Sequence, residues 1–216
     1  RVLFRSGGTA VILPRFTPQG WLEAVRNHEV TFLFSVSSQL EILLQSAPGE
    51  LEQLPALKTV VSSSALLKDE VKIALLRRFS CRLDECYGTS EIAVASNITV
   101  AANSPKNGSV GRPLPHVRVK ICDEHRRTLP PGTVGEIACR TATLFSRYYG
   151  CPEVTQECLD AEGYFYTGDL GMLDEDGYLY FRGRLKEVIK TGGISVFPRD
   201  IEAVILEHDA VAECAV

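Results

Sequence analysis

Short β-rich runs alternate with helical spacings over the first hundred residues of the chain. The β-rich runs predict strands at residues 9–16, 31–37, 58–64 and 81–87. The apolar spacing between them predicts helices at residues 17–29, 39–45 and 68–79. Thr17 followed by Pro18 is typical of a helix N-cap and the first helical position. Strands that alternate with helices predict a parallel sheet covered by helices.

The pattern changes at residues 103–112, where the sequence NSPKNGSVGR is rich in Gly, Ser, Pro and Asn. Beyond this segment the helical spacing disappears, and apolar runs separated by turn sequences predict strands in VRVKIC, GEIACR, GYFYTGDL and GYLYFRG. These strands predict an antiparallel β region, either a sandwich or a barrel. The final segment predicts a strand, a glycine turn, a second strand, a helix at residues 198–208 and a last strand.

We therefore expect an α/β fold, in which a helix-covered parallel sheet is followed by an antiparallel β subdomain and then by the start of a small α+β C-terminal domain. The expected large domain covers residues 1–183, with its α/β region at 1–102 and its β subdomain at 108–182. The hinge and the small domain would occupy residues 184–216. The chain begins at an arginine, has its only methionine at Met172 and stops within an apolar run, so we expect an internal fragment.

Composition excludes several classes of partner. The 216 residues are 45% hydrophobic and include 23 Lys and Arg against 27 Asp and Glu, a formal net charge of −4. This composition is typical of a globular protein, and it contains no basic stripe that would favour nucleic acid or an anionic membrane. No apolar run approaches the roughly 18 residues needed to cross a bilayer, and the start is too short and too charged for a secretory signal. We expect a cytoplasmic protein without an integral membrane segment, and the sequence does not indicate an oligomeric state.

Missing motifs narrow the chemistry further. The seven cysteines include no C-x-x-C pair, which favours free thiols over a disulfide framework or a zinc ribbon. Neither G-x-x-x-x-G-K-[ST] nor G-x-G-x-x-G occurs, which argues against a P-loop ATPase and a dehydrogenase. The acidic sequence DEDG at residues 174–177 predicts a hairpin turn, because a calcium-loop register would place Met172 and Gly183 where carboxylates are required.

The end of the fourth predicted strand has chemistry suited to a nucleotide. It consists of Tyr87, Gly88, Thr89, Ser90 and Glu91. Open α/β sheets bind ligands at the carboxyl ends of their strands. There an aromatic face can stack a base, hydroxyls can contact phosphate oxygens, and a carboxylate can hold Mg²⁺. A polar strand-to-helix turn capped by Thr or Ser is the alternative interpretation.

A second motif, Thr167-Gly168-Asp169, follows an aromatic run. A carboxylate fixed at this position can accept hydrogen bonds from both hydroxyls of a ribose. The alternative is a turn in which Asp169 accepts hydrogen bonds from its own backbone.

Basic residues and glycines mark the junction with the final segment. Arg184 and Lys186 follow Gly183, and Lys190 precedes the pair Gly192 and Gly193. Glycine permits the close approach of a ligand, while arginine and lysine donate hydrogen bonds to anions. A basic surface hairpin is the alternative interpretation.

Taken in order, these motifs resemble those of the AMP-forming superfamily that contains acyl-CoA synthetases, firefly luciferase and peptide-synthetase adenylation domains. YGTSE is similar to the family sequence Tyr-Gly-x-Thr-Glu, and GSVGRPLPHVRVKICD is similar to the entry to its β subdomain. The run that begins with GYFYTGDL and ends with PRDIE is similar to the longest family signature. Pro198 before Arg199 resembles the acyl-CoA ligase branch more than the peptide-synthetase branch.

The resemblance implies a two-step reaction. A small-molecule carboxylic acid, fatty or aryl, attacks the α-phosphate of ATP with Mg²⁺ to give an acyl-adenylate and pyrophosphate, and a thiol, usually that of CoA, then takes the acyl group. By position, the resemblance implies adenine stacking for Tyr87, phosphate contact for Ser90, Mg²⁺ coordination for Glu91, ribose binding for Asp169, and ribose or phosphate support for Arg184.

The resemblance also implies a hinge and a ligand pocket. Lys186 matches the hinge about which the small domain rotates between the half-reactions, and residues 190–193 would line the thiol tunnel. Ser64 and Ala65 belong to SSSALL, which stands where the family usually has Ser-Gly-Gly/Ala-Ala-Pro-Leu beside adenine and the acyl pocket. We therefore expect a narrower and more polar pocket. The sequence SVSS after the second predicted strand also lacks the proline usual in the family.

The expected function is that of a fragment of an ATP-dependent acyl-CoA ligase, with a role such as fatty acid metabolism. The resemblance places the phosphate loop before Arg1 and the catalytic lysine of the small domain after Val216, so we expect the fragment to be inactive alone. Two alternatives stay open: an adenylation domain that loads a carrier-protein thiol, and a non-catalytic nucleotide or acyl binder with the same fold.

Overall fold

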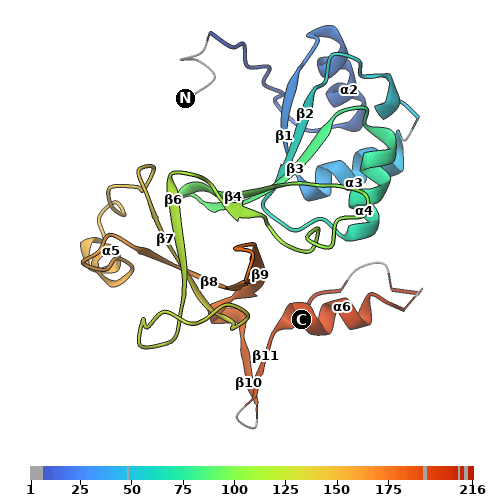
Figure 1. The fold of residues 1–216 in the computed structure, drawn as a ribbon. Coiled ribbons are helices and arrows are strands. Elements are labelled where there is room, and N and C mark those ends of the chain that lie inside the picture. The colour runs from blue at the N-terminus through green and yellow to red at the C-terminus, as the bar shows by residue number, and fades with distance from the viewer. Residues whose placement is uncertain (1–6, 48, 192–193, 209, 212–213) are drawn as a thin grey trace. The chain divides into compact units, whose positions relative to one another are not determined.

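Two sheets and a C-terminal hairpin organise the chain (Figure 1). The computed structural model describes residues 7–47, 49–191, 194–208, 210–211 and 214–216. Contacts divide the chain into two compact units, Arg1–Cys86 with Ile98–Gly108, and Tyr87–Asn97 with Ser109–Val216. The first unit holds parallel strands and the helices packed on them, and the second holds an antiparallel sheet.

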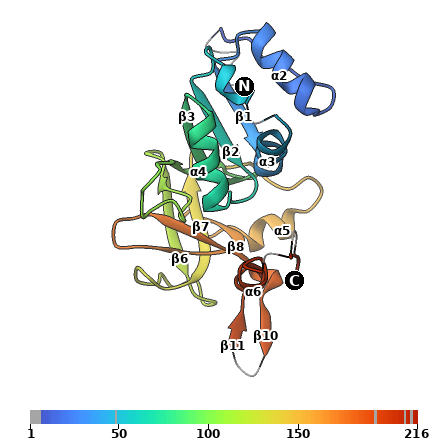
Figure 2. The same ribbon diagram turned by 90° about the vertical axis from the view of Figure 1, so that its right-hand side faces the viewer.

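The first unit contains the parallel part of a five-stranded sheet of order β1-β2-β3-β4-β5. β1 (Phe32–Val36) pairs in parallel with β2 (Thr59–Ser63), which pairs in parallel with β3 (Arg82–Thr89). The connections run through α3 (Ser37–Ser46) and α4 (Asp69–Arg78), which lie beside these strands in Figure 2. The expected helix-covered parallel sheet is confirmed.

Helix α2 (Pro18–Asn27) begins as its sequence predicts. Thr17 Oγ1 accepts a 3.2 Å hydrogen bond from the Gly20 N–H, and Pro18 occupies the first turn, where helical N–H groups have no helical acceptor. Buried apolar side chains join the helices to the strands, and they include Trp21, Leu22, Leu40, Leu43, Val60, Leu75 and Leu83. A short 3-10 turn, η1 (Leu51–Gln53), follows α3.

Residues 9–16 do not form the strand that their sequence predicts. They have neither helix nor strand, and Ile12 is exposed. Among the described residues, β1 pairs only with β2, so no ladder is available on the other edge of β1. A β-rich run needs a neighbouring ladder to become a strand, and propensity alone does not supply one.

Two strands that the sequence pattern does not predict complete the first sheet. β4 (Ala93–Thr99) neighbours β3, and β5 (Arg112–Pro113) pairs antiparallel with β4. YGTSE is therefore followed by a strand, and the interpretation of this motif as a strand-to-helix turn is wrong. Gly88 is required here because a Cβ would clash with the backbone of Ala93.

The second unit is built on a four-stranded antiparallel sheet of order β6-β7-β8-β9. Its strands are β6 (Val117–Cys122), β7 (Gly135–Thr141), β8 (Phe165–Leu173) and β9 (Leu179–Arg184). All four correspond to predicted runs, and they form one antiparallel sheet. DEDG is the hairpin turn between β8 and β9, with Gly177 at φ +78°.

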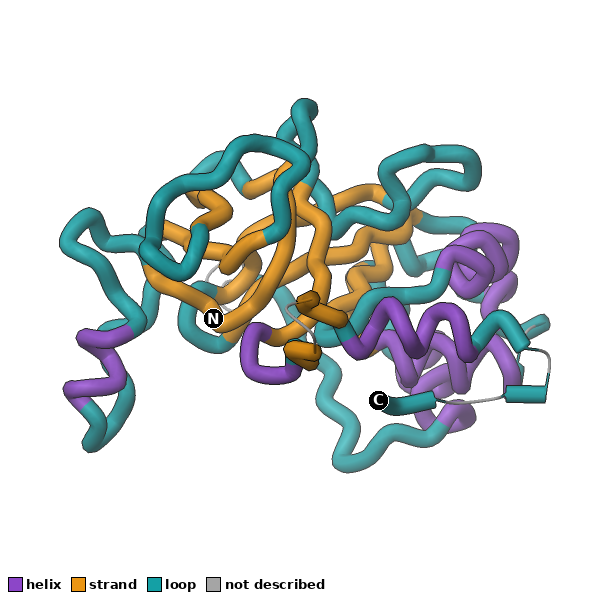
Figure 3. The backbone as a smooth tube through the Cα atoms, turned by 90° about the horizontal axis from the view of Figure 1, so that it is seen from below, coloured by secondary structure: helices purple, strands orange, loops and turns teal. Residues whose placement is uncertain are grey.

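Shorter elements complete the chain (Figure 3). α5 (Pro152–Glu157), which the pattern does not predict, lies between β7 and β8. After β9 come η2 (Leu185–Glu187), the antiparallel pair β10 (Ile189–Thr191) and β11 (Ile194–Val196), and then α6 (Pro198–Ile205). The predicted last strand does not occur in the described residues that follow α6. The seven cysteines are free, and Cys151 is exposed. None of the described helices has the length and apolar character needed to span a membrane.

Candidate functional site

Asp169 is the centre of a buried polar cluster in the second unit. The residue is 2% exposed and lies on β8, paired with Arg184 at the end of β9. The Tyr87 hydroxyl, from the end of β3, donates a 2.7 Å hydrogen bond to Asp169 Oδ2. Arg184 Nε lies 3.0 Å from Asp169 Oδ1. The structure thus brings together three residues that the sequence predicts for a nucleotide site.

One oxygen of the Asp169 carboxylate retains hydrogen-bonding capacity. Oδ1 is buried and accepts no hydrogen bond from the described residues, so its 3.0 Å contact with Arg184 is an ion pair only. Burial raises the pKa of Asp169 above its ordinary value, although the Tyr87 hydroxyl and the Arg184 charge favour the ionised form. A buried acceptor without a hydrogen bond is unfavourable, and a ligand hydroxyl would satisfy it.

Tyr87 presents an aromatic ring beside this carboxylate. The residue is 8% exposed, and its ring centroid lies 6.0 Å from that of Phe181 with the planes tilted by 34°. Burial and the nearby Asp169 charge raise the pKa of the Tyr87 phenol above its ordinary value, so the hydroxyl stays protonated and donates. Phe181 is a contact that the sequence reasoning missed, because it is one apolar residue among several in GYLYFRG.

The part of β8 that precedes Asp169, where the pairing with β7 is irregular, is held by bonds to β7. Thr167 Oγ1 donates to the Ile137 carbonyl at 2.8 Å and accepts the Asp169 N–H at 3.1 Å. Gly168, at φ +70°, donates its N–H to Glu136 Oε1 at 2.9 Å. Thr167 therefore accepts the Asp169 N–H within β8, and the interpretation of TGD as a turn in which Asp169 bonds its own backbone is wrong. The sequence does not indicate Glu136 as a residue of this site, because nothing in GEIACR shows that its carboxylate accepts the Gly168 N–H.

Glu91 is a half-buried carboxylate with one oxygen already oriented. The Tyr148 hydroxyl donates a 2.8 Å hydrogen bond to Glu91 Oε1, and the Glu91 N–H donates to Thr89 Oγ1 at 3.3 Å. Burial raises the pKa of Glu91, but the bonds from Thr89 and Tyr148 and the charge of Arg184 outweigh it, and the pKa lies below its ordinary value. Glu91 is therefore ionised at neutral pH. The sequence does not indicate Tyr148 as a residue of this site, because its partner Glu91 lies 57 positions away.

Ser90 and Thr89 place hydroxyls next to Glu91. Ser90 is exposed in the turn after β3, and Thr89 is half-buried at the end of that strand. Both belong to the second unit with Glu91 and Asp169. These hydroxyls and the Glu91 carboxylate give the turn the donors and acceptors that a phosphate with a divalent cation requires.

A cavity of about 440 Å³ lies beside the part of β8 that carries Gly168. Its lining includes Arg184 and Lys186 together with Tyr148 and Glu136. Lys186 belongs to η2 and is exposed. The cavity mixes cationic, anionic and aromatic groups, so it suits a polar ligand of mixed character.

Ser64 and Ala65 lie in the first unit, in the exposed segment after β2. Ser64 has φ +79°, and the Ser37 hydroxyl donates to the Ala65 carbonyl. Lys190 lies on β10, while Gly192 and Gly193 lie outside the described residues. The roles predicted for these five residues stay predictions.

Comparison with known proteins adds a family to this geometry. The family model described as AMP-binding enzyme matches residues 2–149. The chain is 33% identical over 218 residues to "Probable 4-coumarate--CoA ligase 1" of Dictyostelium discoideum, which covers 100% of this chain and 39% of that protein. It is 31% identical over 217 residues to "Fatty acid--[acyl-carrier-protein] ligase ScoC" of Streptomyces coeruleorubidus, with 99% and 42% covered.

Two solved enzymes share the architecture. The amide bond synthetase McbA from Marinactinospora thermotolerans matches with a TM-score of 0.87 and 35% identity over 95% of this chain and 42% of that one. O-succinylbenzoate coenzyme A synthetase (MenE) from Bacillus subtilis, in complex with AMP, matches with a TM-score of 0.88 and 26% identity over 100% and 44%. The chain thus spans between 39% and 44% of the length of these relatives.

Proposed function

Because the chain belongs to the AMP-binding enzyme family, we propose that it is part of an AMP-forming ligase that activates a carboxylic acid with ATP and transfers the acyl group to CoA. The observation that carries the proposal is the buried Asp169 carboxylate beside Tyr87 and Arg184, whose Oδ1 accepts no hydrogen bond from the described residues. A nucleoside offers both a pair of hydroxyls and an aromatic base to this arrangement.

Three residues would bind the nucleoside of ATP. The ribose hydroxyls would donate to Asp169 Oδ1, which satisfies the buried acceptor. The Tyr87 ring would supply an aromatic face for adenine. The exposed Arg184 guanidinium would reach the ribose or a phosphate, since it donates several N–H groups in a planar fork. Ser64 and Ala65 would line the adenine and acyl pocket.

The turn after β3 would hold the phosphates. Gly88, Thr89 and Ser90 would contact phosphate oxygens, and Glu91 would ligate Mg²⁺. Among the described residues no cluster of three or more acidic, cysteine or histidine side chains can hold a metal ion by itself. An ionised carboxylate that acts with substrate phosphates fits Mg²⁺, which commonly uses one or two carboxylates in this way. When bound, Mg²⁺ neutralises charge on the phosphates.

The chemistry would run in two half-reactions. One oxygen of the acid attacks the α-phosphorus of ATP, the bond to the β-phosphate breaks, and pyrophosphate leaves with the electron pair. The thiolate sulfur of CoA then attacks the acyl carbon, and AMP leaves. The residues around Asp169 would hold the nucleoside, and the turn after β3 the phosphates, in place for these steps. Lys186 would be the hinge between the two steps, and Lys190, Gly192 and Gly193 would line the thiol tunnel.

A carrier-protein thiol is the second candidate acceptor. It is supported by the similarity to a protein named as an acyl-carrier-protein ligase. The same ATP site would serve either acceptor, because the thiol enters only after acyl-AMP has formed. A non-catalytic binder is the third candidate, and it would bind ATP without forming acyl-AMP.

The test uses the full-length protein with ATP, Mg²⁺ and a panel of fatty and aryl acids. We expect acyl-AMP and pyrophosphate in the absence of thiol, and acyl-CoA with an equal amount of AMP when CoA is added. Transfer to a carrier protein but not to CoA would replace the first candidate with the second. ATP binding without acyl-AMP from any acid would leave only the non-catalytic candidate.

A further inference from the structure

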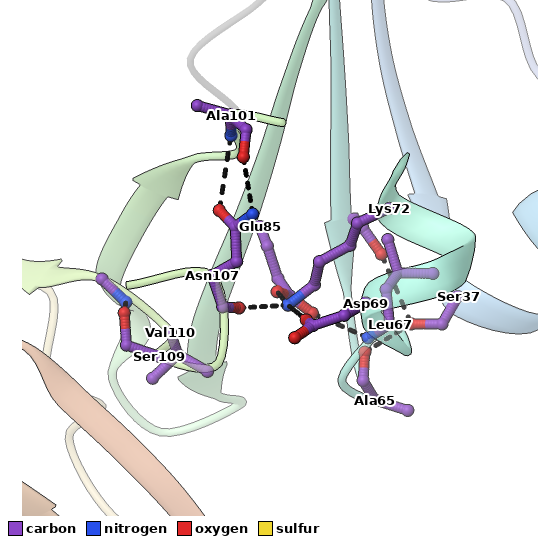
Figure 4. A network of polar contacts seen from close by, with 12 residues as sticks. Ser37, Ala65, Leu67, Asp69, Lys72, Glu85, Ala101, Asn107, Ser109 and Val110 are labelled. Carbon is purple, nitrogen blue, oxygen red and sulfur yellow. Dashed lines mark hydrogen bonds and ion pairs between the residues drawn. The ribbon is translucent and has the colours of Figure 1, made fainter. Parts of the chain in front are cut away.

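A buried ion pair in the first unit consists of two residues that have no role in the site proposed above (Figure 4). Lys72 on α4 and Glu85 on β3 are each 1% exposed, and Lys72 Nζ lies 2.7 Å from Glu85 Oε2. Removing two charges from water is unfavourable, and their attraction offsets it only when further hydrogen bonds satisfy them. The groups that form hydrogen bonds with Lys72 and Glu85 therefore indicate the role of the ion pair.

The pair is bonded to the backbone on both sides. Glu85 Oε1 accepts a 2.8 Å hydrogen bond from the Leu67 N–H. Lys72 Nζ donates to the Asn107 carbonyl, and the Asn107 side chain in turn bonds both the N–H and the carbonyl of Ala101, at 3.3 and 2.6 Å. Two buried charges thus join α4, β3, the loop that carries Asn107 and the segment that ends at Leu67.

That segment, residues 64–67 after β2, is anchored at a second point. The Ser37 hydroxyl, at the start of α3, donates to the Ala65 carbonyl. Ser64 lies between β2 and this anchor at φ +79°, a conformation that a serine retains only where its surroundings hold it. The segment with exposed Ser64 and Ala65 is therefore anchored by two buried side chains, Ser37 at Ala65 and Glu85 at Leu67.

We propose that Glu85, held by Lys72, is a positioning residue for the segment 64–67 and thereby fixes the conformation in which Ser64 and Ala65 meet their ligand. This inference rests on the proposed function, which puts Ser64 and Ala65 beside adenine and the acyl group. Lys72 acts through Glu85, because its contact with Oε2 holds the carboxylate in the orientation in which Oε1 accepts the Leu67 N–H. A pair that only stabilises the fold would instead join α4 to β3 without affecting ligands.

Two double variants of the full-length protein separate these roles. Lys72→Met with Glu85→Gln and Lys72→Met with Glu85→Met both remove both charges from the buried site. Glutamine keeps a side-chain oxygen that can accept the Leu67 N–H, whereas methionine has only a weak sulfur acceptor. The two variants therefore differ in the bond that holds the segment and are matched in the loss of the ion pair.

We expect the Leu67 amide to exchange its hydrogen about tenfold faster in the Glu85→Met variant than in the Glu85→Gln variant, the size expected for one lost hydrogen bond. We also expect the KM for ATP and for the acid to rise about five- to tenfold in the Glu85→Met variant. In the Glu85→Gln variant both should stay within about twofold of wild type. A role in stability alone predicts equal KM values in the two variants and differences in melting temperature only.

Several outcomes would overturn the inference. Equal exchange at Leu67 would show that Glu85 does not hold the segment, and faster exchange with unchanged KM would show that the segment does not shape the pocket. Should the double variants fail to fold, Glu85→Asp provides the same test: it keeps the charge but shortens the reach to Leu67, with Lys72→Arg as its control. Absence of acyl-AMP from the wild-type protein would refute the proposed function itself, while the exchange comparison would still report on Glu85.

Discussion

Replacement of Asp169 by alanine in the full-length protein gives the sharpest test of the site. The change removes both carboxylate oxygens, so any ribose loses its charged acceptor. It also removes the acceptor of the Tyr87 hydroxyl and the ion-pair partner of Arg184. The first loss affects ATP, and the second affects the folded protein.

The two losses have different magnitudes and different observables. A hydrogen bond to a charged group contributes about 1.5–3 kcal/mol, which corresponds to about a 10- to 150-fold fall in kcat/KM for ATP. The buried Tyr87 hydroxyl left without its acceptor costs about 1–3 kcal/mol of folding free energy. The melting temperature reports the second effect, and the ATP dependence of the folded enzyme reports the first.

The assay is acid-dependent ATP–pyrophosphate exchange at varied ATP, with Asp160→Ala as the matched control. Asp160 is another carboxylate of the second unit that accepts bonds from a lysine and a tyrosine, Lys120 and Tyr166, each at 3.1 Å. Its loss should lower the melting temperature while kcat/KM for ATP stays within about twofold of wild type. An unchanged ATP dependence in Asp169→Ala, or an equal loss in Asp160→Ala, would remove Asp169 from the site.

Three further changes test other parts of the site. Lys186→Pro fixes φ and removes a backbone N–H, so the small domain should no longer turn freely. Single-turnover acyl-AMP formation should then stay near wild type while thioester formation falls at least about tenfold. Equal losses in both steps would show that Lys186 is not the hinge. Tyr148→Phe removes a hydrogen bond that lowers the pKa of Glu91, so the pKa of Glu91 should rise. The acid limb of the ATP–pyrophosphate exchange activity should therefore move to higher pH. An unmoved acid limb would show that ionisation of Glu91 does not control this activity. Gly88→Ala should lower the free energy of unfolding by about 1–3 kcal/mol, because the new Cβ meets the backbone of the next strand. Gly108→Ala is the control, because a Cβ at that position has open space. Equal shifts in melting temperature for the two variants would contradict the close approach at Gly88.

Local patterns predicted the elements whose burial is set by their own sequence. The sequence predicts β1, β2 and β3 and the helices between them correctly, because the apolar residues of each of these elements face one core. β4 is not predicted, and residues 9–16 are wrongly predicted as a strand, since a strand depends on a partner ladder that the local sequence does not contain.

The candidate site divides in the same way. YGTSE and TGD marked Tyr87 and Asp169 as chemically suitable, but their mutual hydrogen bond joins residues that are 82 positions apart and no spacing rule predicts it. Lys72 illustrates the same limit within a helix. A lysine in a helical pattern favours solvent, and only the carboxylate of Glu85 makes a buried position favourable.

Arg184 connects two functions that are usually considered separately. It forms an ion pair with Asp169 across the β8–β9 pair and precedes Lys186 by two residues. With Lys186 as the proposed hinge, a rotation there leaves Arg184 on β9 and moves the residues that follow, among them Glu187, whose charge acts on Asp169, and so changes the field at the proposed ribose acceptor. Nucleotide occupancy and domain orientation then share a coupling free energy. Thermodynamic linkage makes that coupling reciprocal, so the orientation that bound ATP favours must itself bind ATP more tightly by the same factor.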